Sequence, residues 1–142
     1  MRAAFTSRLD ISLSCSNVQY IAGAHSAFRS TTVWNTLGAV IHYGVSPATS
    51  IAAGYSYTRA AKANRITSGA QYQQVSFAQY YALSKSSGLY AVEAYQRSNG
   101  QTLAADGTTV IAATADVGDG FNSAPSSGRS QFVGGAGFIH RF

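Results

Sequence analysis

The chain has 142 residues, of which 46% are hydrophobic and only 11% are charged, against about 25% in a typical soluble protein. With one cysteine and a formal net charge of +5, this composition excludes a disulfide scaffold, a coiled coil and a disordered chain rich in charge. The ten basic residues are scattered along the sequence, so no nucleic-acid partner is expected.

Apolar and polar residues alternate through most of the chain, which predicts an all-β protein of antiparallel strands with two different faces. About seven strands are expected. In chain order they cover residues 5–15, 18–29, 36–45, 51–58, 74–83, 90–97 and 131–142. Trp34 has the parity of the polar face, so either a bulge shifts the alternation or its ring faces inward.

The expected connections differ in length in a regular way. Short turns are predicted at residues 15–17, 46–49 and 84–87, and the remaining connections at 30–33, 61–71 and 98–128. Every second connection is short, and two of the other three are long. This sorting is typical of transmembrane β-barrels, which have short turns on one side of the membrane and long loops on the other.

The two faces also differ in a way that suggests lipid on one side. The polar face is mostly Gly, Ser, Thr and Gln, whereas aromatic residues gather near the strand ends, as the aromatic girdles of membrane barrels do. The aromatic residues near turns are Trp34, Tyr43, Tyr57, Tyr81, Tyr90 and Phe142. Cross-strand aromatic packing in a soluble β-sheet binding or adhesion module is the alternative.

Five motifs stand out in the second half of the sequence: YSYTRA at 55–60, YYALSK at 80–85, LYAVEAYQR at 89–97, GDGFN at 118–122 and GFIHRF at 137–142. Together they resemble the C-terminal part of the general porins of Gram-negative bacteria, of the burkholderial type. The resemblance runs from Val33 to Phe142, and residues 1–32 are expected to add further strands. It implies part of a sixteen-stranded, homotrimeric barrel in the outer membrane that passes small hydrophilic solutes and ions by diffusion.

The resemblance also implies that the barrel-assembly machinery reads the last strand, which ends in Phe138, His140 and Phe142. Porins of this family are longer and begin with a signal peptide, and the start of this sequence does not have that pattern. We therefore expect residues 1–142 to be the C-terminal portion of one porin barrel domain, incomplete as a channel on its own.

Charged and polar residues with the parity of the polar face would line the channel and bias ion passage. These pore-lining candidates are Arg8, Asp10, Thr36, His42, Glu93, Arg97 and Arg141. No catalytic, cofactor-binding or metal site is expected, because the three histidines fall on separate predicted strands. The chain is therefore not expected to be an enzyme.

Overall fold

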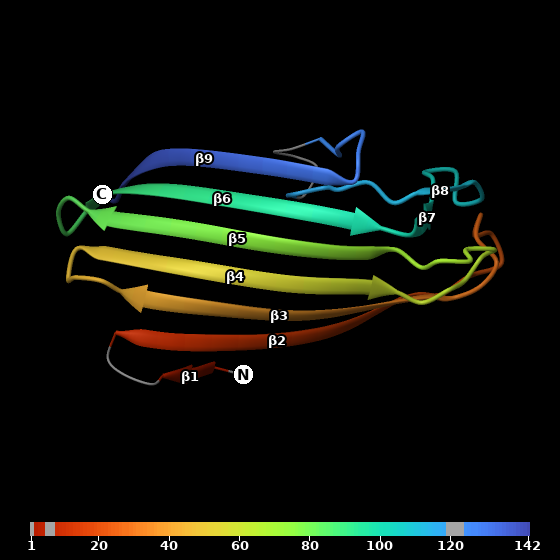
Figure 1. Ribbon diagram of the computed structural model, residues 1–142, viewed down its shortest axis with the longest axis horizontal. Coiled ribbons are helices and arrows are strands. Elements are labelled where there is room, and N and C mark those ends of the chain that lie inside the picture. The colour runs from red at the N-terminus through yellow and green to blue at the C-terminus, as the bar shows by residue number, and fades with distance from the viewer. Residues whose placement is uncertain (1, 5–7, 119–123) are drawn as a thin grey trace.

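The computed structural model describes residues 2–4, 8–118 and 124–142, and within them the protein is all-β and antiparallel, with no helix. The main sheet has seven strands in the order β1-β2-β3-β4-β5-β6-β9 (Figure 1). Their bounds are Arg2–Ala4 (β1), Leu9–Tyr20 (β2), Thr32–Gly44 (β3), Thr49–Ala60 (β4), Gln71–Ala82 (β5), Ser87–Asn99 (β6) and Ser130–His140 (β9). In this described part, no helix is long and apolar enough to cross a membrane.

Neighbouring strands pair without interruption, so the connections are sorted between the two ends of the sheet. At one end, called here the turn end, residues 45–48 and 83–86 form tight turns. The predicted turns are confirmed there, because the Ser46 amide donates to the Thr49 carbonyl and the Ser84 amide to the Ser87 carbonyl, both at 3.1 Å. The other end, the loop end, carries the long connections 21–31, 61–70 and 100–129.

The first part of the chain corrects two predictions. The expected turn at 15–17 lies inside β2, which pairs with β3 continuously from Leu9 opposite Tyr43 to Tyr20 opposite Thr32. The second expected strand, 18–29, is divided between β2 and the loop at 21–31. The run of serine and asparagine that suggested a turn is polar on both faces of one continuous strand. Residues 5–7 of the first expected strand lie outside the described residues.

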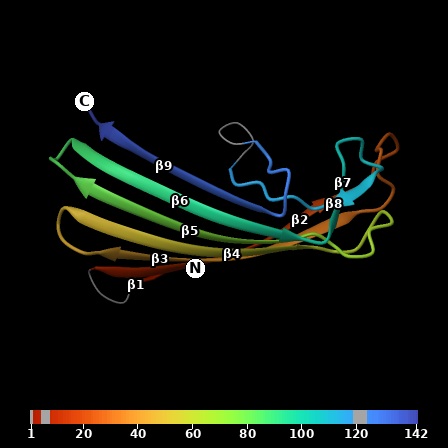
Figure 2. The same cartoon turned by 45° about the horizontal axis from the view of Figure 1, so that its top comes forward.

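The described residues between β6 and β9, 100–118 and 124–129, lie outside the strands of the main sheet. Within them, Gln101–Leu103 (β7) and Val110–Ala112 (β8) pair as a small separate hairpin. The main sheet is strongly bent, and the segment leading into β9 lies over one side of it (Figure 2).

A small packed cluster lies at the loop end. Ala60, Ala70 and Ala113 are buried there, with Trp34 and Tyr72 packed against them. The two aromatic rings stack with their centroids 6.0 Å apart. The pairing of β3 with its neighbours is continuous around Trp34, so no bulge shifts the alternation there. Of the two predicted alternatives, the inward-facing ring is therefore the one observed.

Candidate functional site

The strand pairing assigns every residue of the sheet to one of two faces, which we call face A and face B. In β2 to β6 and β9, face A carries the odd-numbered residues of β2 to β6 and the even-numbered residues of β9, and face B carries the other residues of these six strands. The bent sheet therefore presents two surfaces that can be compared row by row.

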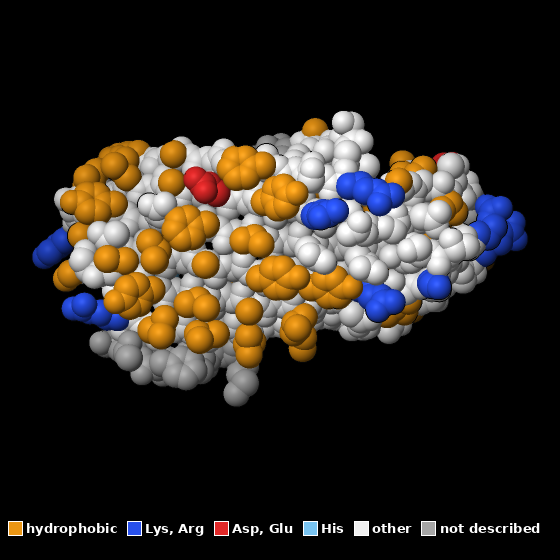
Figure 3. All heavy atoms as spheres, viewed as in Figure 1, with side chains coloured by type: hydrophobic (Ala, Val, Ile, Leu, Met, Phe, Trp, Pro, Cys, Tyr) orange, Lys and Arg blue, Asp and Glu red, His pale blue; other side chains and the backbone are white. Residues whose placement is uncertain are grey.

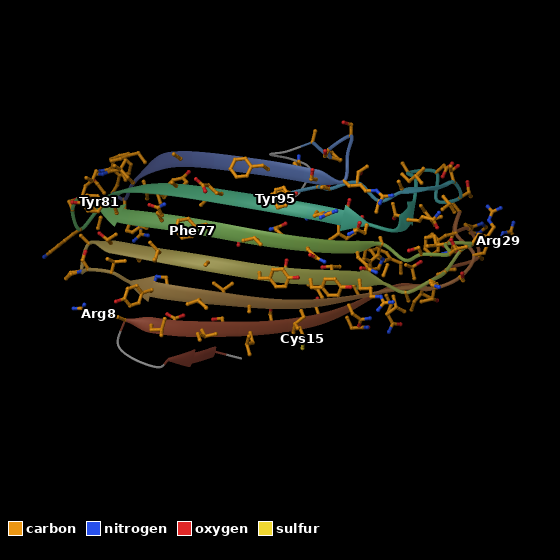
Figure 4. All side chains as sticks on the ribbon, viewed as in Figure 1. Arg8, Cys15, Arg29, Phe77, Tyr81 and Tyr95 are labelled. Carbon is orange, nitrogen blue, oxygen red and sulfur yellow. The ribbon has the colours of Figure 1, made fainter. Side chains whose placement is uncertain are left out.

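Face A is an uncovered apolar surface. Its exposed members include Leu13, Leu37, Ile41, Tyr43, Tyr55, Val75, Tyr81, Leu89, Tyr95, Phe132 and Phe138. Figure 3 shows these hydrophobic side chains spread over the strands, and Figure 4 shows Phe77, Tyr81 and Tyr95 among them. From the row of Tyr81 and Leu89 to the row of Leu37 and Tyr57, the apolar band covers four two-residue steps, about 27 Å along the strands at 3.4 Å per residue.

The polarity of both faces changes at the loop end. There face A becomes polar, in a row formed by Asn17, Asn35, Arg59, Gln71 and Asn99. Face B becomes apolar instead, with Val18, Tyr20, Trp34, Ala60 and Tyr72. On face B at this end, Trp34, Ala60 and Tyr72 pack in the buried cluster. Val18 and Tyr20 line a cavity together with loop residues and stay partly exposed.

Two of the expected girdle aromatics therefore lie on the other face. Trp34 and Tyr90 are on face B, so their assignment to a girdle on the apolar face was wrong. The ring of Tyr90 lies over Gly137, where a Cβ would have no room, and the ring of Tyr80 lies over Gly88 in the same way. Each ring therefore packs on the backbone of a glycine in the neighbouring strand.

Three predicted pore-lining residues are on face B, with Asp10 and His42 near the turn end and Thr36 nearer the loop end. Asp10 of β2 and His42 of β3 stand directly opposite, with Oδ2 3.3 Å from Nδ1. On the same face, the Thr36 hydroxyl is hydrogen-bonded to the hydroxyl of Thr58 at 2.9 Å. Asp10, Thr36 and His42 therefore lie on one face of the sheet, and their role in lining a pore stays a prediction.

Arg8 and Arg141 are exposed at the turn end, outside the strands. The Arg8 carbonyl accepts a hydrogen bond from the Gly44 amide at 2.8 Å, and the Arg141 amide donates to the Ser86 carbonyl at the same distance. Figure 4 shows Arg8 at this end of the sheet, with Arg29 at the loop end. Arg8 and Arg141, both predicted to line the pore, lie at the rim of the sheet.

Glu93 and Arg97 are on face A, which corrects the prediction that they share a face with Asp10 and His42. Glu93 stands opposite Phe77, and Arg97 stands opposite Gln73. The alternation was ambiguous here because residues 89–92 are apolar on both parities, and the phase was set one residue out. Both side chains are exposed.

Sequence reasoning missed the group of glutamines on face B that holds an inward-folded segment. Gln96 Oε1 accepts from the Asp116 amide at 2.8 Å, and Gln131 Oε1 accepts from the Val117 amide at 2.7 Å. The Ser98 hydroxyl donates to the Ala113 carbonyl at 2.8 Å.

Residues 113–117 are thereby fixed against face B, with Ala113, Ala115 and Val117 buried. The signal in the sequence was weak, consisting only of small apolar residues alternating inside a predicted loop. Residues 119–122 of the GDGFN motif follow this segment and lie outside the described residues.

The last residues form a short aromatic ladder on face A. Phe138 and His140 stack with ring centroids 6.4 Å apart, and His140 meets Phe142 edge to face at 4.7 Å. His140 Nδ1 lies 2.8 Å from the Ser87 hydroxyl, which ties the end of β9 to the start of β6. Phe138 is 58% exposed, and Phe142 is fully exposed.

Comparison with known proteins gives no family assignment: no protein-family model and no curated protein sequence matches the chain. Among residues 8–118 and 124–142 there is no group of three or more His, Cys, Asp or Glu side chains that could hold a metal ion. The features on which a function can be argued are thus the two faces and the two ends of the sheet.

Proposed function

We propose that this chain forms part of the wall of an outer-membrane porin, with face A toward lipid and face B toward a water-filled channel. The observation that carries the proposal is the uncovered apolar band on face A. Large apolar patches on a soluble monomer usually mark an interaction surface, and a band that follows six neighbouring strands fits a bilayer.

The dimensions support this assignment. An outward-facing apolar band about 25 Å tall is usual for transmembrane barrels, whose strands tilt by about 40°. The band on face A extends about 27 Å along the strands, so at that tilt its height would be about 21 Å. The strands β2 to β6 and β9 have 11 to 13 residues, enough for the 9–11 that span a bilayer. The sorting of turns and loops between the two ends agrees with the same architecture.

The edges of the sheet indicate how such a wall would close. β1 and β9 are the edge strands, and an open edge inside hydrocarbon leaves backbone groups without partners. Both edge strands run toward the turn end, so an antiparallel closure needs an odd number of further strands between them. The total is then even, as in bacterial barrels, and a sixteen-stranded barrel meets this condition.

On face B, the proposed channel wall carries hydrogen-bonding side chains and the close contact of Asp10 with His42. The segment 113–117 lies on this wall, so it would narrow the channel near its loop end. Transport by this wall is passive diffusion of small hydrophilic solutes and ions, because the pore supplies a polar path and no chemical step.

The assembly of the porin is part of the same proposal. The aromatic ladder of Phe138, His140 and Phe142 is accessible for recognition by barrel-assembly machinery. Three such barrels would associate as a homotrimer in the outer membrane, as the resemblance implies.

A labelling experiment tests which face meets lipid. In a Cys15→Ser background, Val75→Cys places a thiol on face A, and Ser76→Cys places one on face B of the same central strand. Each variant is refolded into vesicles and labelled with a fluorophore. We expect lipid-borne nitroxide to quench the label at 75 and aqueous iodide to quench the label at 76. Equal quenching of both labels by iodide would refute the proposal.

A soluble β-sheet binding or adhesion module is the second candidate, and one observation favours it. Glu93 is an exposed acidic residue within the apolar band, where contact with lipid is unfavourable. A soluble module would refold without detergent as a monodisperse monomer, whereas the porin wall needs detergent or lipid to stay in solution.

A further inference from the structure

At the loop end, face A carries a polar cleft directly beyond the apolar band. The cleft has a volume of about 570 Å³ and lies between the ends of β3 to β5 and the loop at 61–70. We call it the Arg59 cleft. Its polar lining residues are Asn35, Arg59, Lys62, Thr67, Ser68 and Gln71.

The cleft is positively charged and its charges are unpaired. Arg59 and Lys62 both line it, and none of the residues around it is acidic. Within the described part of the chain, neither basic side chain has a salt bridge or a side-chain hydrogen bond. Hydroxyl and amide groups surround the two cations, so the cleft offers donors to an anion.

The loop that forms one wall of the cleft is held firmly in place. Asn64 Oδ1 accepts hydrogen bonds from the Arg29 and Ser30 amides at 2.9 and 2.7 Å, which joins the loop to its neighbour. The Ala60 amide donates to the Ala70 carbonyl at 2.8 Å, which closes the base of the loop. The cleft is therefore formed before any ligand arrives.

The position of the cleft indicates an amphipathic ligand. Tyr57, in the last apolar row, precedes Arg59 on the same face of β4, about 7 Å away along the strand. A molecule with acyl chains along Leu37 and Tyr57 would place its headgroup at Arg59 and Lys62. Figure 3 shows this change from hydrophobic to basic side chains toward the loop end.

We propose that the Arg59 cleft binds the phosphate-bearing headgroup of an anionic lipid at the loop-end boundary of the bilayer. This inference rests on the proposed lipid-facing role of face A. Each basic residue near an anionic lipid surface contributes about 1 kcal/mol, which is about fivefold in affinity, so the pair is expected to contribute about 25-fold.

The test is a titration of the refolded chain in neutral detergent with phosphatidylglycerol, followed by native mass spectrometry. Phosphatidylcholine with the same acyl chains is the neutral comparison. We expect tighter binding of phosphatidylglycerol and a loss of about 25-fold in Arg59→Gln/Lys62→Gln. The matched control Arg29→Gln/Lys85→Gln removes the same charge from exposed residues outside the cleft and should keep the preference.

The other outcomes are decisive as well. If the Arg59→Gln/Lys62→Gln variant still prefers phosphatidylglycerol over phosphatidylcholine to the same extent, the lipid site is overturned and the porin proposal is unaffected. Inorganic phosphate that binds as tightly as phosphatidylglycerol, and loses that binding in the Arg59→Gln/Lys62→Gln variant, identifies a free-phosphate site and overturns the lipid assignment. A chain that forms its sheet only without detergent overturns both the porin proposal and this inference. Circular dichroism of each variant verifies that the sheet is kept.

Discussion

Replacing Ile41 by arginine measures what face A meets. Ile41 lies in the central row of the apolar band, opposite Ile11 and Ala53, and is 47% exposed. If lipid covers that exposed part, its loss costs about 1 kcal/mol, roughly half the transfer free energy of an isoleucine side chain. An arginine near the bilayer midplane adds about 2–4 kcal/mol, so we expect a total of about 3–5 kcal/mol.

Val40 supplies the control, because it is adjacent, similarly exposed at 45% and on face B. Arginine at this position would reach water in the channel, and we expect Val40→Arg to cost less than about 1 kcal/mol. The free energy of unfolding is measured by urea titration of the chain refolded in vesicles. Equal costs for the two substitutions, or a cost below about 1 kcal/mol for Ile41→Arg, would refute a lipid-facing band.

Three further predictions concern other parts of the molecule. Glu93→Gln removes a carboxylate from the apolar band and should stabilise the vesicle-bound chain by about 1 kcal/mol, and a loss of stability in urea titration would contradict this. The Thr109 hydroxyl and the Thr109 and Thr108 amides lower the pKa of the loop residue Asp106 to about 2. The ionised Asp106 carboxylate therefore stabilises the folded loop fully above its unfolded pKa near 4, and this stabilisation is lost as the pH falls toward 2. A midpoint near 4 for Asp106 in an NMR titration would refute the lowered pKa. Gln96→Ala removes the acceptor of the Asp116 amide, whose hydrogen exchange should become about fivefold faster, whereas unchanged exchange would show that Gln96 does not hold this segment.

The alternation of residues predicted the antiparallel sheet because one face of it is apolar over most strands. The turns at 46–49 and 84–87 were predictable from local residues, since Ser46 and Ser84 begin tight turns whose hydrogen bonds close within four residues. These turns depend on local sequence alone. The pairing of Asp10 with His42 was not predicted, because the turn expected at 15–17 placed another strand between their two strands.

The misassigned positions have a common physical origin. Residues of distant loops lie beside the apolar residues of face B at the loop end: Trp34 packs against the buried cluster, and Val18 and Tyr20 line a cavity with loop residues. No local pattern reports which face a distant loop will approach. The apparent break at 15–17 is this change of face within one strand, not a turn. Glu93 and Arg97 were misplaced because the flanking residues are apolar on both parities.

The cluster of Trp34, Tyr72 and the buried alanines has a consequence for how the chain folds. These side chains are buried by the protein's own loops, so this end of the molecule can form in water. The apolar band lies on face A, the opposite face of the sheet from this cluster; it is uncovered and gains its burial only from lipid if the porin proposal holds. The loop end would then be a nucleus that organises early, and the strands below it would become stable as they insert into the bilayer.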